Sequence, residues 1–271
     1  MAPPSDADDR SAYLARVGAA LDEFLHGEHV DPMTRRDEWM GVLERPLPDE
    51  GIGGNGVIDE LVSNVVPNGA RINEPGFWGW ITTEPTAVAT AASLAATVAS
   101  PQRYTLTAFN YLEELSLNWL AQLCGLRSNM KGVYSSGGSV ANLVALGAAR
   151  QWAFEQRGVD PAADGLGDSR AAIYASEESH HTILRSAGVL GLGRRSVRLI
   201  PTDGQQRLDP AALARALEED KVLGIMPLAV VATAGTTNTG AVDPLRECGE
   251  LARHYGAWFH VDGAYGLPGI L

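Results

Sequence analysis

The sequence of 271 residues contains little lysine and little positive charge of any kind. Lys131 and Lys221 are its only lysines, arginine supplies the other basic side chains, and the formal net charge is −12. Nucleic acids and anionic membranes both bind clusters of lysine and arginine, so a chain with this charge balance is expected to bind neither.

Cysteine and long hydrophobic runs are also scarce. Cys124 and Cys248 have neither the spacing of metal ligands nor that of a disulfide framework, which favours a reducing, cytoplasmic location and predicts no metal site. The polar, acidic N-terminus lacks the pattern of a signal peptide. The alanine-rich run 86–99 is too short and too weakly apolar to span a membrane. We therefore expect a globular protein without a membrane segment.

The composition and hydrophobic periodicity of the chain change near residue 85. Residues 11–25 place apolar side chains on one helical stripe, whereas residues 31–85 are rich in proline, glycine and asparagine and show little periodicity. Residues 1–84 are therefore predicted to form a helical and extended N-terminal arm rather than an independent domain. The apolar stripe needs a cover, from the chain's own domain or from a second subunit.

Residues 85–271 are predicted to form an α/β domain. Near-continuous apolar strands, AAIYAS, SVRLIPTD, PLAVVATAG and AWFHVDGA, alternate with amphipathic helices. Further helical patterns cover 86–99, 109–124 and about 140–156. Such strands indicate a buried, mainly parallel sheet, in which ligands bind beyond the carboxyl ends of the strands. Two helices share an Asp-Pro start, which predicts that Asp209 and Asp243 are N-terminal caps.

Two motifs with ligand-binding potential flank the first of these strands. SSGGS, residues 135–139, stands directly before a helix, where adjacent glycines and free N–H groups suit a phosphate, although a plain tight turn has the same composition. YASEESHH places His180 and His181 just after the strand. A histidine at that position is otherwise a cap or a satisfied polar group.

Two more motifs follow later strands. ATAGTT places Thr236 and Thr237 where their hydroxyls either bind a ligand or close a turn. FHVDGAYG places Asp262 at the end of a strand, an expensive position unless a positive group, such as a structural arginine, meets the carboxylate. A phosphate cradle, an imidazole, a hydroxyl pair and a carboxylate together suit pyridoxal phosphate, because a carboxylate keeps its ring nitrogen protonated.

Four stretches, SSGGSVANLVAL, YASEESHHTILRSAG, VATAGTTNTGAVDP and FHVDGAYG, resemble the successive motifs of the group II pyridoxal-phosphate-dependent amino-acid decarboxylases. This family has the type I, aspartate-aminotransferase-like fold. The resemblance covers about residues 70–268 and implies decarboxylation of an L-amino acid to an amine and carbon dioxide. It implies phosphate binding by Gly138 and Ser139, ring stacking by His180, contact with cofactor and substrate by Thr237, pairing with the ring nitrogen by Asp262, and packing beneath the ring by Ala264.

The resemblance extends to the substrate pocket and to the assembly. NEPGFWGWI is similar to the family's substrate-pocket loop, which makes Trp80 and Ile81 candidates for the pocket walls. The family has a histidine at the position of Glu74, and His181 stands where several members carry a small hydroxyl residue. An N-terminal arm that intertwines in a dimer is typical of the family, which favours a homodimer.

Two other interpretations of the same residues stay open. Another type I enzyme, such as a lyase, a desulfurase or an oxidative aldehyde synthase, would use the same cradle, histidine and aspartate. A chain of this fold can also serve as a non-catalytic partner subunit. Product analysis separates these classes, because only decarboxylation followed by protonation gives carbon dioxide and an amine without ammonia or aldehyde.

The resemblance also implies a lysine that binds the cofactor, a few tens of residues beyond the HVDxAY motif. No lysine follows Gly266 here, while Lys131 precedes the glycine-rich loop and Lys221 follows a surface helix. We therefore expect a second polypeptide, or a segment missing from this sequence, to supply the lysine and a C-terminal domain. The chain alone, with its sheet incomplete, is expected to be inactive.

Overall fold

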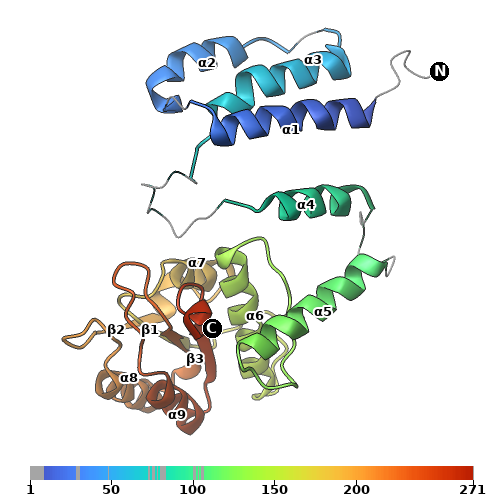
Figure 1. Cartoon of the computed structure of the whole chain (residues 1–271). Coiled ribbons are helices and arrows are strands. Elements are labelled where there is room, and N and C mark those ends of the chain that lie inside the picture. The colour runs from blue at the N-terminus through green and yellow to red at the C-terminus, as the bar shows by residue number, and fades with distance from the viewer. Residues whose placement is uncertain are drawn as a thin grey trace. The chain divides into compact units, whose positions relative to one another are not determined.

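A computed structural model of the chain (Figure 1) describes residues 9–28, 31–47, 49–72, 74, 77, 79, 84–99, 102, 104 and 107–270. The chain divides into two compact units, Met1–Thr97 and Val98–Leu271. This division falls inside helix α4 (Ala87–Ala99), and the boundary at residues 84–85 between arm and domain stays a prediction.

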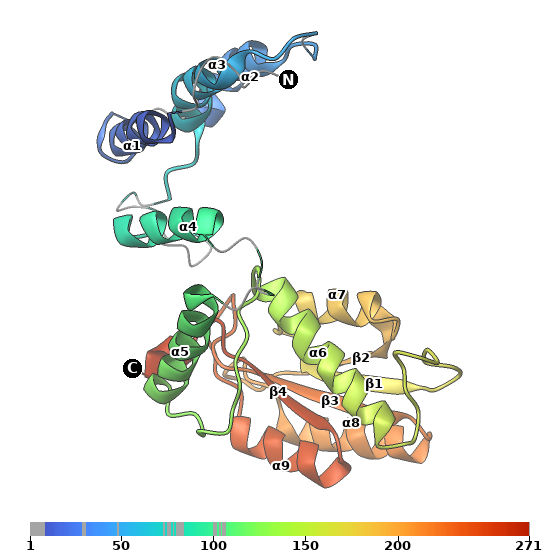
Figure 2. The same cartoon turned by 90° about the vertical axis from the view of Figure 1, so that its right-hand side faces the viewer.

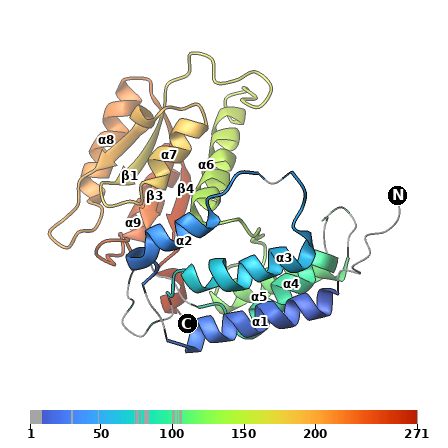
Figure 3. The ribbon, with the colours of Figure 1, turned by 90° about the horizontal axis from the view of Figure 1, so that it is seen from above.

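The described part of the first unit is helical. Helix α1 (Arg10–His26) begins after Asp9, whose side chain accepts a hydrogen bond from the backbone N–H of Ala12. Helices α2 (Arg36–Leu43) and α3 (Gly53–Glu60) follow, and α3 continues into a π-helical turn (Leu61–Val65) and a 3-10 turn (Val66–Asn68). Helices α1 and α3 pack side by side (Figures 1 and 3). The segment predicted to be extended therefore contains short helices, which this packing stabilises in the absence of a long periodic pattern.

The second unit combines helices with a sheet. Helix α5 (Ala108–Leu123) starts at a capping box made by Thr107 and Asn110, and α6 (Gly138–Glu155) follows the glycine-rich loop. The strands are β1 (Ala171–Ser176), β2 (Val197–Ile200), β3 (Met226–Thr233) and β4 (Trp258–Asp262). Helices α7 (Thr182–Val189), α8 (Pro210–Val222) and α9 (Leu245–Tyr255) alternate with them.

All four strands are parallel and lie in the order β2-β1-β3-β4. Ser176 pairs with Ile200 and Thr233 pairs with Asp262, so that the carboxyl ends of the strands lie along one edge of the sheet. The predicted α/β class, with a parallel sheet flanked by helices, is confirmed.

The core has two layers, one on each face of the sheet (Figure 2). Ile173 and Ala175 of β1 pack with α6 and α7, whereas Ala172 and Tyr174 pack with α8 and α9, as the alternation of side chains along a strand requires. Strands β1 and β3, buried on both faces, form a rigid base for the loops at their carboxyl ends.

The two Asp-Pro sequences have different roles. Asp209 caps α8 as predicted, because its side chain accepts a hydrogen bond of 2.8 Å from the backbone N–H of Ala211. Asp243 does not cap α9, and the prediction for it is wrong. It is buried, and its two oxygens accept the backbone N–H groups of Leu208 (2.8 Å) and Thr233 (2.7 Å). Asp243 therefore joins the loop after β2 to the end of β3, a contact that only the folded chain creates.

Candidate active site

The candidate site lies at the edge of the sheet where the parallel strands end. His180 follows β1, the threonine pair follows β3, and Asp262 is the last residue of β4. The start of α6, which carries the glycine-rich loop, belongs to the same site, because Asn142 in its second turn is hydrogen-bonded to Asp262. Segments separated by more than a hundred residues in the sequence therefore meet at this edge.

Asp262 is half-buried and is held by two donors. Its Oδ2 accepts a hydrogen bond of 3.1 Å from Nδ2 of Asn142, and its Oδ1 accepts one of 3.2 Å from the backbone N–H of Ala264. Within the described part of the chain, no arginine or lysine forms an ion pair with Asp262. The alternative of a structural arginine partner therefore has no support among these residues, and the carboxylate can receive a cationic group from a ligand.

A chain of hydrogen bonds connects Asp262 to His180. Asn142 is buried, and its Nδ2 also donates to Oγ1 of Thr182 at 3.0 Å. Oγ1 of Thr182 lies 2.8 Å from Nδ1 of His180. The remaining polar atom of Asn142, Oδ1, lies 2.7 Å from Nε2 of His260. Asn142 therefore uses all of its hydrogen-bonding groups within the site.

The histidines of the site differ in their electrostatic surroundings. The rings of His180 and His181 lie with their centroids 4.1 Å apart and their planes tilted by 37°. The adjacent His180 is the main cause of a lowered pKa at the exposed His181, and Arg185 acts in the same direction. Burial lowers the pKa of His260, although the nearby charge of Asp262 opposes the shift. The neutral form of His260 is thus favoured.

The glycine-rich loop leaves open space at the start of α6. Gly137 has φ of 139°, which only glycine adopts readily, and a Cβ atom at Gly137 or Gly138 would meet nothing within 4 Å. The first N–H groups of any α-helix lack acceptors inside the helix, and the helix dipole makes that end positive. Gly138 and the exposed Ser139 are the first residues of α6, so this end offers donors and room for an anion.

The two threonines after β3 are not equivalent. Thr236 is fully buried and closes the turn, since its Oγ1 lies 2.6 Å from Oγ1 of Thr239 and accepts the backbone N–H of Ala241. Thr237 is exposed and leaves its hydroxyl at the surface. Of the two functions predicted for the pair, Thr236 has the structural one.

The threonine loop packs closely against the turn after β4. The backbone N–H of Gly266 donates to the carbonyl oxygen of Ala234 at 2.9 Å, and a Cβ atom at Gly266 would lie 2.2 Å from that oxygen. The backbone N–H of Ala234 in turn donates to the carbonyl oxygen of Asp262 at 2.8 Å. This backbone pairing fixes the threonine loop beside Asp262, and it requires glycine at position 266.

Two buried hydroxyls beside the site have no hydrogen-bond partner within the described ranges, Oγ of Ser179 and Oγ1 of Thr233. Ser179 directly precedes His180, and Thr233 is paired with Asp262 across the sheet. A buried polar group without a partner costs about 1–3 kcal/mol. A polar ligand at this edge would offset part of that cost.

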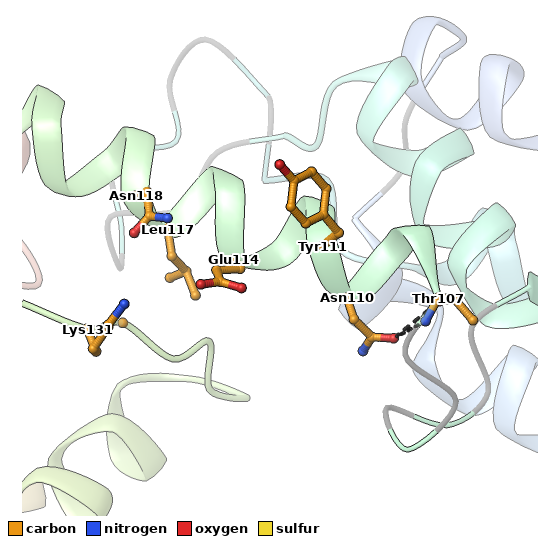
Figure 4. A pocket seen from close by; sticks show the side chains of 8 residues that line it. Thr107, Asn110, Tyr111, Glu114, Leu117, Asn118 and Lys131 are labelled. Atoms are coloured by element: carbon orange, nitrogen blue, oxygen red, sulfur yellow. Dashed lines mark hydrogen bonds between the residues drawn. The ribbon is translucent and has the colours of Figure 1, made fainter.

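Neither lysine of the chain lies in this group of residues. Nζ of Lys221 is 3.7 Å from Oε2 of Glu218 and 5.7 Å from the ring centroid of Tyr255, so it belongs to the α8–α9 side of the sheet. Lys131 faces α5 across a pocket of about 500 Å³, which residues such as Glu114 also line (Figure 4).

The candidate site contains residues predicted from the sequence and residues that were not predicted. Trp80 and Ile81, predicted to line the substrate pocket, lie outside the described residues. Asn142, Thr182 and His260 were not predicted as functional residues. Asn142 could have been found from the sequence, because it is the one polar residue in a helical stripe whose other members include Leu146, Ala149 and Ala153. In the described ranges, no cluster of three potential metal ligands is present and no helix could cross a membrane.

Comparison with known proteins gives consistent matches. The model of the pyridoxal-dependent decarboxylase conserved domain matches residues 45–269. An aromatic-L-amino-acid decarboxylase of Bacillus atrophaeus is 37% identical over 160 residues, which cover 59% of this chain and 31% of that protein. Tryptophan decarboxylase 1 of Oryza sativa subsp. japonica is 31% identical over 281 residues, which cover 97% of this chain and 54% of that protein.

Solved structures give the same result. The crystal structure of Oryza sativa TDC with PLP and tryptamine matches 100% of this chain and 58% of that chain, with a TM-score of 0.82 and 30% sequence identity. This chain therefore spans between about a third and somewhat over half of the length of the relatives that it matches.

Proposed function

The chain belongs to the family of pyridoxal-dependent decarboxylases, and from this premise we propose that it forms the cofactor site of an enzyme that converts an L-amino acid to an amine and carbon dioxide. The observation that carries the proposal is the surroundings of Asp262. Its carboxylate ends a strand, has no basic partner among the described residues, and is hydrogen-bonded through Asn142 and Thr182 to His180.

The residues present fit the phosphate end of pyridoxal phosphate. Gly138 and Ser139 would hold the phosphate, because they begin an 18-residue helix next to the open space at Gly137. Backbone N–H groups and the positive end of the helix dipole are suited to a phosphate dianion. The ring end is suited too, since Asp262 would pair with the ring nitrogen, His180 would cover one face of the ring, and Ala264 would pack against the other.

The roles of the protein residues follow from their chemistry. Pyridoxal phosphate, when bound, supplies a conjugated ring that accepts the electron pair left by the departing carbon dioxide. Asp262 holds a proton at the ring nitrogen, and a carboxylate does so because its charge stabilises the cationic form of its partner. His180 orients the ring and excludes water from that face. The exposed hydroxyl of Thr237 is available to orient the substrate carboxylate.

We also propose that the lysine that binds the cofactor lies outside residues 1–271, and that this chain alone is inactive. Support comes from the positions of Lys131, which faces α5, and of Lys221, which is paired with Glu218. Borohydride reduction in the presence of the cofactor, followed by peptide mapping, tests this point. A pyridoxyl group on Lys131 or Lys221 of an active, isolated chain would refute it.

The complete enzyme is further proposed to be a cytoplasmic homodimer. Helix α5 exposes several large apolar side chains, including Leu112, Trp119 and Leu123 at 53%, 50% and 62%, and a second subunit would cover such a surface. Both cysteines are free thiols, as suits a reducing compartment. Analytical ultracentrifugation of the complete enzyme measures the subunit number, and a monomer at micromolar concentration would contradict this part.

Release of carbon dioxide from each of the common L-amino acids tests the proposed activity. The complete, cofactor-loaded enzyme is used, and aromatic amino acids come first because two of the similar proteins carry the names aromatic-L-amino-acid decarboxylase and tryptophan decarboxylase. Stoichiometric amine and carbon dioxide are the expected products. Ammonia or an aldehyde would show a different reaction of the same cofactor, and no product from any amino acid would favour a non-catalytic subunit.

A further inference from the structure

The hydrogen-bond network between Asp262 and His180 passes through Asn142, which lies on α6 and not at the end of a strand. We propose that Asn142 is a positioning residue of the cofactor site: it fixes the carboxylate of Asp262 and, through Thr182, the tautomer of His180. This inference rests on the proposed function, because its value for catalysis depends on a cofactor bound between these residues.

The burial of Asn142 makes its hydrogen bonds obligatory. Only 6% of the residue is exposed, and it lies on the face of α6 that packs on the sheet. A primary amide in such a position costs free energy unless its groups are bonded. Asn142 meets this requirement through Thr182, Asp262 and His260, at 3.0, 3.1 and 2.7 Å. The same three contacts tie α6 to the start of α7 and to β4.

The acceptor chemistry of Asp262 decides how the amide of Asn142 is oriented. An ionised carboxylate only accepts hydrogen bonds, so the NH₂ group of Asn142 must face Asp262 and the carbonyl oxygen must face His260. The opposite orientation would set two oxygens against each other at 3.1 Å. His260 must then donate from Nε2, which places its proton there.

Thr182 extends this constraint to His180. Oγ1 of Thr182 accepts the second N–H of Asn142, which leaves the hydroxyl proton of Thr182 free to be donated to Nδ1 of His180 at 2.8 Å. The backbone N–H of Thr182 is farther from Nδ1, at 3.4 Å, which is too long for a strong hydrogen bond. The hydroxyl is therefore the donor that matters, and it requires a lone pair on Nδ1, so a neutral ring of His180 carries its proton on Nε2.

The consequence is a site whose two cofactor-facing groups are oriented together before any ligand binds. Asp262 ends β4 and His180 follows β1, and these strands are separated by β3 in the sheet. Through its contacts with Asp262 and Thr182, Asn142 spans this separation. Support of this kind, in which a buried second residue fixes the groups that touch a ligand, is what holds a binding site in its productive geometry.

The test uses the complete holoenzyme and two substitutions of Asn142. Asn142→Asp keeps the shape of the side chain but replaces the donor that faces Asp262 with an acceptor, and Asn142→Leu removes all of the hydrogen bonds at similar volume. The matched control is Gln156→Glu, the same amide-to-carboxylate change at an exposed position directly after the far end of α6. Thermal unfolding of each variant checks the fold.

Two spectroscopic measurements and one kinetic measurement report on the positioning role. Nitrogen-15 NMR of labelled histidine reads the tautomer of His180, and the visible absorbance of the bound cofactor, titrated with pH, reads the state of its ring. For both Asn142 variants we expect a mixture of His180 tautomers, a shifted absorbance titration, and a fall in kcat of about 10- to 100-fold, the effect of losing one hydrogen bond to a charged group. KM should change less, and Gln156→Glu should match the wild type.

The outcomes separate this inference from the proposed function. A folded Asn142→Leu enzyme with the wild-type His180 tautomer and wild-type cofactor absorbance would overturn the inference. If the Asn142 variants fail to fold, Thr182→Val replaces them, since it removes only the hydroxyl and should still free the tautomer of His180; an unchanged tautomer in that variant overturns the inference too. A wild-type protein that binds no pyridoxal phosphate would instead refute the proposed function, and the NMR measurement would still test the tautomer.

Discussion

Replacement of Asp243 by alanine should destabilise the protein more than any loss of a helix cap would. Both oxygens of this buried carboxylate accept backbone N–H groups, from Leu208 at 2.8 Å and from Thr233 at 2.7 Å. Alanine leaves both donors buried without an acceptor, at about 1–3 kcal/mol each. Burial raises the pKa of Asp243, so removal of its charge returns part of this cost. We expect a net loss of about 2–4 kcal/mol in the free energy of unfolding.

The chain contains a matched control for this prediction. Asp209 precedes proline as Asp243 does, but it caps α8 through the backbone N–H of Ala211. Asp209→Ala should therefore cost only about 1 kcal/mol, the usual effect of losing a cap. Urea unfolding followed by circular dichroism measures both variants, with the slope against urea checked for constancy. If Asp243→Ala costs no more than Asp209→Ala, the role given to the buried carboxylate is wrong.

Three further predictions concern Tyr174, His260 and His180. Tyr174→Phe should cost about 1–2 kcal/mol of stability, because the hydroxyl of this buried residue donates to Oδ2 of Asp220 at 2.9 Å. Tyr255→Phe removes a hydroxyl that reaches the exposed Glu218 and should cost less than about 0.5 kcal/mol. Equal losses in urea unfolding would contradict this difference. The pKa of His260 is lowered in the folded protein, so the unfolded chain binds a proton at this residue more readily, and stability should fall as the pH drops below about 6.5. His260→Gln should make this fall in stability smaller, as measured by urea unfolding at a series of pH values. The same pH dependence in the variant and the wild type would exclude His260 as its source. His180→Ala should weaken cofactor binding and change the visible absorbance of the holoenzyme, and an unchanged affinity and spectrum would remove His180 from the site.

The fold was largely predictable because its central strands, β1 and β3, are buried on both faces. Continuous apolar runs such as the one from Met226 to Thr233 can hardly form anything but central strands of a parallel sheet, and their alternation with amphipathic helices sets the class. The short helices α2 and α3 were missed because they lack a strong period of their own and depend on packing, α3 on α1 and α2 on the π-helical turn Leu61–Val65.

The site was predictable where a residue is unusual for its position and unpredictable where its partner is distant in the sequence. Asp262 stands out as a charge at the end of an apolar strand, and Gly137 and Gly138 stand out as adjacent glycines before a helix. Asn142 lies 120 residues before Asp262, so only the folded chain shows that the two side chains meet. The same holds for Asp243, whose Asp-Pro context locally predicts a cap.

The protonation state of the cofactor's ring nitrogen tests the central claim most directly. Pyridoxal phosphate labelled with nitrogen-15 in the ring would be bound to the complete wild-type enzyme and to Asp262→Asn, and its chemical shift would be measured by NMR. We predict the shift of a protonated ring in the wild type and of a neutral ring in the variant, with turnover nearly abolished and the fold retained. A protonated ring in both proteins, together with near-normal turnover in Asp262→Asn, would contradict the role of Asp262 on which the proposed site depends.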